Sequence, residues 1–93
     1  MAQIVQAGNN WKLSGDVVIA TANDILKASQ AFTLSKNTTI DFADVEDIDT
    51  TAVSLILEWK RRAVKENQSL TIENLPNNLT SLVQLYDVAD LIN

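Results

Sequence analysis

The sequence predicts an α/β fold in which helices pack against a mixed β-sheet. Short runs of apolar and β-branched residues alternate with longer segments that repeat apolar residues every three or four positions. The resulting order is strand, strand, helix, strand, helix, strand, helix, and two of the helices are crossovers between strands. Because the first two strands are close enough in sequence to form a hairpin, we expect the sheet to be mixed.

Four strands are expected, at residues 3–7, 11–17, 38–42 and 69–73. The Gly-Asn-Asn segment at residues 8–10 tolerates positive φ, as a β-hairpin turn requires, and joins the first two strands. In the third strand, Ile40 and Phe42 alternate with polar neighbours, which indicates one buried face. This strand is expected to end in an acidic turn.

Three helices are expected, from Thr21 to Ala31, from Thr50 to about Glu66, and from Pro76 onward. Thr21 with Asp24 three residues later resembles an N-terminal capping signal. The second helix has the clearest amphipathic pattern. The last helix carries its apolar residues on one side, namely Leu79, Leu82, Val83, Tyr86 and Ala89.

The composition is that of one ordered globular domain, residues 1–93. The chain has 46% hydrophobic and 20% charged residues, with two Gly and one Pro. Its net charge of −5, from 12 acidic and 7 basic residues, argues against nucleic acid and anionic lipid as partners.

Most catalytic constellations are unavailable to this sequence. It has no Cys and no His, which excludes thiol nucleophiles, imidazole bases and the usual zinc ligands. The two glycines form no phosphate-binding loop. We therefore expect a protein that is not an enzyme and that has no cofactor. With no 18-residue apolar run and no signal-peptide pattern at the N-terminus, we also expect a cytoplasmic chain that reaches a membrane only through a partner.

Residues 40–57 are the most informative segment, because an Asp-Thr-Thr triplet there opens an apolar helix. The hydroxyl groups of Thr50 and Thr51 are placed at a helix N-terminus, where free N–H groups and the positive end of the helix dipole meet. They are candidates for contact with a partner or a phosphate. The alternative is that Asp49, Thr50 and Thr51 only cap the helix, which is worth about 1 kcal/mol.

A stripe along this helix predicts a docking surface with an apolar centre and a polar rim. Its residues are Thr51, Leu55, Glu58 and Arg62, with Trp59 at its edge. The stripe lies opposite Val53, Ile56 and Leu57, and Leu55 and Trp59 cannot easily share the core with them. The alternative is a tilt of the helix that buries Trp59 at the expense of Leu57.

Charged residues form two groups, one before this helix and one in its second half. Five carboxylates precede it, at Asp41, Asp44, Glu46, Asp47 and Asp49. Oxygen ligands suit hard cations, but the spacing does not match a calcium loop, so a solvated acidic turn is the preferred interpretation over a metal site. Four of the cations lie in the second half of the helix, at Lys60, Arg61, Arg62 and Lys65, where they complement its dipole.

The same region resembles the STAS family, the domain of anti-sigma factor antagonists and of anion-transporter tails. The most specific part is a pattern of hydrophobic and Asp residues that ends in Ser or Thr. It is matched by Ile40, Asp41, Phe42, Val45, Ile48, Asp49 and Thr50. The resemblance covers essentially the whole chain and implies a STAS-like mixed sheet of four to five strands with three or four helices.

Within the family, QLYDVADLI near the end and a threonine directly after Asp49 are most similar to the short STAS subunit of a phospholipid ABC transporter. That resemblance implies a non-enzymatic subunit that binds the transporter ATPase through the start of the second long helix. Thr50 matches the threonine of that subunit, and Thr51 matches the serine that is phosphorylated in sporulation-type antagonists. Ala52 replaces the usual glycine, which favours helix but removes room for a close backbone approach.

Two hypotheses follow. In the first, Thr50, Thr51 and the exposed stripe form a constitutive interface with a transporter ATPase. In the second, Thr51 is a phosphorylation site that regulates binding to an anti-sigma factor kinase. A phosphate would add roughly −1.5 to −2 charges to a packed interface, enough to release a partner.

Overall fold

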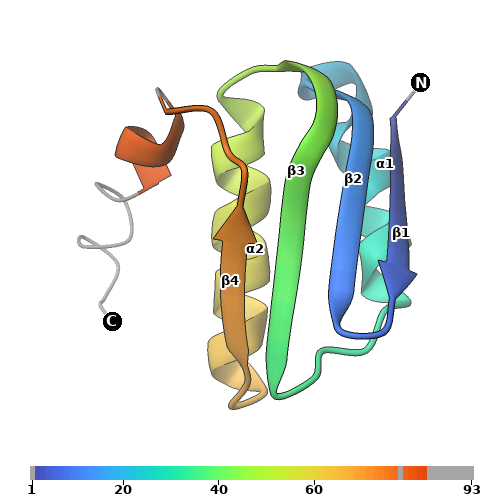
Figure 1. Cartoon of the computed structure of the whole chain (residues 1–93), viewed down its shortest axis with the longest axis vertical. Coiled ribbons are helices and arrows are strands. Elements are labelled where there is room, and N and C mark those ends of the chain that lie inside the picture. Colours follow the sequence, from blue (N-terminus) through green and yellow to red (C-terminus); the bar gives the residue numbers. More distant parts are fainter. Residues whose placement is uncertain (1, 78, 84–93) are drawn as a thin grey trace.

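The computed structural model describes residues 2–77 and 79–83, which form a four-stranded sheet with its helices on one side (Figure 1). The elements are β1 (Gln3–Ala7), β2 (Asn10–Val17), α1 (Ile19–Gln30), β3 (Asn37–Ile48), α2 (Thr51–Lys65) and β4 (Ser69–Glu73). Residues 77 and 79–83 are also helical. The predicted α/β fold with a mixed sheet is confirmed.

The strands lie in the order in which they occur along the chain. β1 and β2 form an antiparallel hairpin, and Gly8 in its turn has φ of 62°. β2 pairs with β3, and β3 pairs with β4, in parallel, so that α1 and α2 are the crossovers. Both helices lie behind the sheet as seen in Figure 1, which leaves the opposite face of the sheet without a helix among the described residues.

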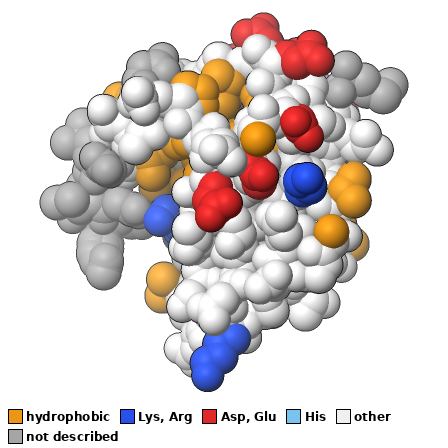
Figure 2. Space-filling view, viewed as in Figure 1, with side chains coloured by type: hydrophobic (Ala, Val, Ile, Leu, Met, Phe, Trp, Pro, Cys, Tyr) orange, Lys and Arg blue, Asp and Glu red, His pale blue; other side chains and the backbone are white. Residues whose placement is uncertain are grey.

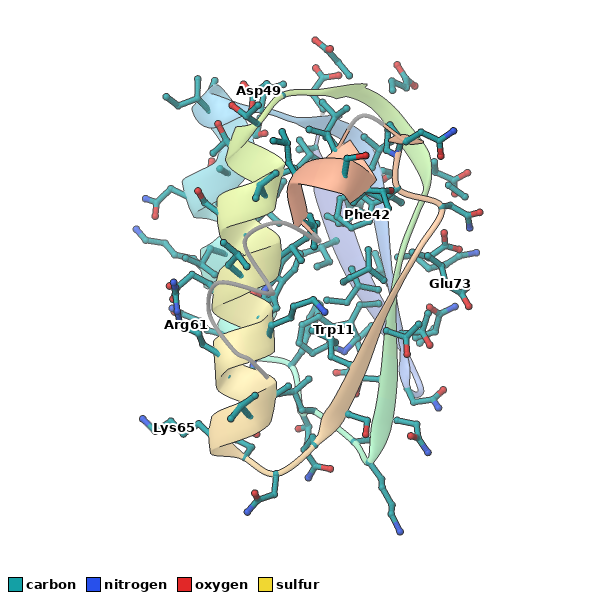
Figure 3. The ribbon with its side chains drawn as sticks, turned by 90° about the vertical axis from the view of Figure 1, so that its left-hand side faces the viewer. Trp11, Phe42, Asp49, Arg61, Lys65 and Glu73 are labelled. Carbon is teal, nitrogen blue, oxygen red and sulfur yellow. The ribbon has the colours of Figure 1, made fainter. Side chains whose placement is uncertain are left out.

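Alternation along the strands sorts the side chains between these two faces. Trp11 in β2 and Phe42 in β3 are buried and point between the sheet and α2, whereas Glu73 points away from the helices (Figure 3). Trp11 is the centre of an aromatic cluster, with edge-on contacts to Phe32 at 5.2 Å and to Trp59 at 6.2 Å between ring centroids. This cluster fixes the position of α2 over the sheet.

The acidic stretch after Phe42 is a strand and not the turn that the sequence predicts. β3 continues to Ile48 because its backbone pairs in parallel with β2, at Gly15 with Val45 and at Val17 with Ile48. Register shifts interrupt this part of the pairing. The acidic side chains of the stretch are exposed, and Figure 2 shows red acidic side chains gathered on the open face and its upper end.

The helix ends differ slightly from prediction. α1 begins at Ile19 with Val18 as the N-cap residue, so Thr21 lies in its first turn. The Thr21 hydroxyl accepts a hydrogen bond from the Val18 N–H at 3.2 Å and donates one to the Asp16 carbonyl at 2.7 Å. Thr21 therefore still stabilises the start of α1, but from within its first turn.

The last predicted helix is described only in its first turns. Leu79 and Val83 are buried in the core, and Leu82 is partly buried against it, as the pattern predicts. Tyr86 and Ala89 lie outside the described residues. Among the residues that are described, no helix combines the length and the apolar character needed to span a membrane.

Candidate functional site

The carboxylate of Asp49 joins the N-termini of the two helices. Its Oδ1 accepts a hydrogen bond from the Thr51 N–H at 2.8 Å, and its Oδ2 accepts one from the Ile19 N–H at 3.1 Å. Asp49 lies where the chain enters α2 (Figure 3). One side chain thus satisfies a free N–H in the first turn of both α1 and α2, where the positive ends of the helix dipoles favour an anion.

This geometry perturbs the titration of Asp49. The hydrogen bond from the Thr51 side chain, together with the backbone bonds from Thr51 and Ile19, lowers the pKa of Asp49 below its ordinary value. Desolvation opposes the shift but is outweighed. Asp49 is therefore ionised at neutral pH, and its carboxylate bonds to the first residue of both helices.

Between the two helices, next to Asp49, lies an open groove with a volume of about 270 Å³. It is lined by Ile19, Ala22, Asn23, Leu26, Thr51, Ser54, Leu55 and Glu58. The side chain of Ile19 is 77% exposed at the start of α1. Apolar side chains from both helices form much of the lining, with hydroxyl, amide and carboxylate groups among them, and we call this feature the α1–α2 groove.

The two threonines have different environments. Thr50 is the N-cap residue of α2 and is exposed, but its hydroxyl makes no capping hydrogen bond. Thr51 is half-buried, lines the α1–α2 groove and bonds to Asp49. The capping interpretation is thus correct for Asp49 and wrong for the hydroxyl of Thr50. Ala52, at the departure from the family pattern, is fully buried.

The expected exposure of Leu55 and Trp59 is wrong. Leu55 is 4% exposed and Trp59 is 1% exposed. The indole Nε1 of Trp59 donates to the Ser29 hydroxyl at 2.9 Å, in the interior between α2 and α1. The tilt that would bury Trp59 at the expense of Leu57 describes the observed helix, because Leu57 is only partly buried.

Arg62 does not lie at the polar rim of a docking surface, contrary to expectation. Its Nη1 donates to the Ser29 carbonyl at 3.0 Å, and its Nη2 donates to the Phe32 carbonyl. The guanidinium also lies 5.7 Å from the centre of the Trp11 ring. Arg62 therefore caps the end of α1 and fastens it to α2, while Glu58 is exposed as predicted and pairs with Arg61.

The acidic cluster is solvated only in part, because Asp41 and Asp49 are half-buried. Asp44, Glu46 and Asp47 are exposed on β3. Asp41 accepts hydrogen bonds from the Asn74 side chain at 2.7 Å and the Ala43 N–H at 2.9 Å, which lower its pKa. Within residues 2–77 and 79–83, no three carboxylates come together in a way that could hold a metal ion.

Sequence reasoning missed the α1 side of the groove. Ile19, Ala22 and Leu26 follow one another at intervals of three and four, which is the spacing of one helical face. The signal was present, but a helix that starts at Thr21 leaves Ile19 outside it. The site predicted along one helix thus becomes a groove between two, formed with Thr51, Leu55 and Glu58 from α2.

Comparison with known proteins agrees with this fold. The family model described as "Mlab, STAS domain" matches residues 3–93. The chain therefore belongs to the STAS family, the class of domain that the fold defines. Within that family it matches the MlaB type.

Two solved structures share the fold. "Crystal Structure Analysis of Mglu" has a TM-score of 0.59 and 22% identity over 81% of this chain and 20% of that chain. "Crystal Structure Analysis of Mglu in its native form" has a TM-score of 0.56 and 18% identity over 78% of this chain and 22% of that chain. This chain thus spans about a fifth of those chains, and such low identities show the fold alone. No curated protein sequence matches the chain.

Proposed function

We propose that this chain is the non-catalytic STAS subunit of a phospholipid ABC transporter of the Mla type. In this proposal it binds the MlaF-like ATPase subunit through the front of α2 and supports assembly or activity of the complex. The MlaB-type family match supports this role. The chain would then be cytoplasmic and would associate with the inner membrane only through its partner.

The α1–α2 groove is the observation that best supports the proposed binding of a protein partner. Its volume of about 270 Å³ is below the roughly 300 to 1,000 Å³ typical of small-molecule sites. A groove of this size can take one or two side chains of a protein. The exposed Ile19, Ser54 and Glu58 surround an apolar floor, and that arrangement is typical of protein interfaces.

Co-expression with the ATPase subunit tests the proposal. Thr50→Glu adds a charge at the front of α2, and Ile19→Gln removes the most exposed apolar side chain of the groove. Each should lower co-purification about tenfold, or 1.4 kcal/mol, with an unchanged circular dichroism spectrum. Val64→Gln is the matched control, because Val64 is also 77% exposed but lies at the other end of α2. If both variants bind like wild type, neither the front of α2 nor the groove is the contact.

The phosphoswitch at Thr51, with an anti-sigma factor kinase as partner, is the competing hypothesis. The Thr51 N–H donates a hydrogen bond to the Asp49 carboxylate at 2.8 Å, so a phosphate on Thr51 would lie near an ionised carboxylate and be repelled. This contact favours the constitutive interface. Mass spectrometry that finds phosphorylated Thr51 in cells, lost in Thr51→Ala, together with capture of a kinase in place of the ATPase, would reverse that preference.

A further inference from the structure

We propose that β1 pairs with β1 of a second copy of this chain, which joins two sheets into one. β1 is at the end of the sheet and has β2 as its neighbour. Figure 1 shows no labelled element beyond it. The outer side of its backbone therefore has no strand partner in the described part of the chain. This edge is separate from the α1–α2 groove, so the inference does not rest on the proposed function.

The absence of charge on β1 favours a second copy as the partner. Exposed edge strands are normally protected by charged residues or proline, and β1, with the sequence QIVQA, has neither. The other edge strand, β4, carries Glu73. In an antiparallel two-fold pairing centred on Val5, residues 3 and 4 face residues 7 and 6 of the other copy, and Val5 faces its own copy. None of these residues is charged, so no like charges repel across the pair. In a chain of net charge −5, β1 is an edge that two copies can share without such repulsion.

The side chains of β1 suit an antiparallel register centred on Val5. Ile4 is 8% exposed and packs under the helices, whereas Val5 is 49% exposed and pairs with Lys12 of β2. Figure 2 shows apolar side chains beside a basic one at this side of the open face. In the two-fold register the two Val5 side chains lie opposite each other, with Cβ atoms about 4.5 to 5.5 Å apart. Pairing therefore buries an exposed apolar residue on each copy.

The size of the contact sets its strength. β1 has five residues, so the pairing buries less than the roughly 1,200 to 2,000 Å² of a stable complex. We therefore expect a weak dimer, with a Kd of about 0.1 to 1 mM, or 4 to 5.5 kcal/mol.

Sedimentation equilibrium of the full chain tests this inference. Between about 10 μM and 2 mM, which brackets the expected Kd, the mass should rise reversibly from 10.2 kDa toward twice that value. Val5→Lys should raise Kd at least tenfold. Thr71→Lys is the matched control, because Thr71 is exposed on the other edge strand and the variant has the same net charge. A monomer at every concentration, or a dimer weakened only by Thr71→Lys, would overturn the proposal.

Cross-linking checks the register independently. Because the chain has no cysteine, Val5→Cys introduces a single thiol, and the proposed pairing places the two thiols close enough for a disulfide. Mild oxidation at high concentration should yield a covalent dimer of Val5→Cys and leave Thr71→Cys largely monomeric. Equal cross-linking of the two variants would show random collision and contradict the register. Co-purification with the ATPase subunit should be unchanged in Val5→Lys, which separates this inference from the proposed function.

Discussion

The two halves of α2 use their polar groups in opposite ways. In the rear half, Trp59 and Arg62 are both bonded to the end of α1, and Arg62 also lies over Trp11. In the front half, Thr50 and Ser54 are exposed, and α2 is separated from α1 by the groove. The rear half holds the fold together, and the front half presents a surface.

This difference teaches that one helical stripe can serve two purposes. Thr51, Leu55, Glu58 and Arg62 share a stripe by periodicity, but only Thr51, Leu55 and Glu58 line the groove. Arg62 reaches back across the helix interface because its long side chain can satisfy carbonyl groups at the end of α1. Variants in the two halves should therefore separate loss of stability from loss of binding.

The largest effect is expected for Leu55→Asp, at the floor of the groove. Leu55 is 4% exposed, so the variant places a carboxylate in the core and leaves a cavity. The free energy of unfolding should fall by about 4 kcal/mol or more, measured by urea denaturation followed by circular dichroism. A variant that is fully folded but does not bind the ATPase subunit would mean that Leu55 is a surface residue, which contradicts the comparison.

A smaller effect is expected for Arg62→Met, which keeps the apolar stem and removes the guanidinium. The loss of charge-assisted bonds to the Ser29 and Phe32 carbonyls should cost about 2 kcal/mol in urea unfolding. Binding to the ATPase subunit should be retained. Arg61→Met is the control, because the Arg61 side chain is 56% exposed, and loss of its ion pair should cost less than about 0.5 kcal/mol. Equal costs for the two variants would mean that Arg62 does not fasten α1.

Much of the fold follows from local patterns in the sequence. The Gly8 turn, the alternation of Ile40 and Phe42 and the repeat in α2 each depend on residues close in sequence, and the structure confirms all three. The extension of β3 does not follow in this way, because the pairing of Val45 and Ile48 with β2 depends on distant residues. The acidic residues after Phe42 therefore suggest a turn, although pairing with β2 makes this segment a strand.

The site is predicted in part, for a related reason. Thr50, Thr51 and Glu58 are at the surface or half-buried as their positions on α2 indicate. Leu55 and Trp59 are not, because the core formed with Trp11 and α1 is wide enough to take both. The width of the core depends on the elements that pack against α2. It therefore cannot be predicted from the pattern of apolar residues in α2 alone.

The smallest effect, and the sharpest test of the front half, is expected for Asp49→Asn. Asp49 has a lowered pKa in the folded state, so its stabilising contribution is present above the ordinary aspartate pKa of about 4 and is lost as the pH falls through the lower folded value. The variant should therefore unfold at lower urea than wild type at pH 7, and this difference should shrink toward zero near pH 2. Asp47→Asn, exposed on β3 two residues earlier, should show little difference at either pH. A deficit for Asp49→Asn that is the same at both pH values would mean that the charge of Asp49 does not hold the two helix ends, and the front of α2 would then be positioned by packing alone.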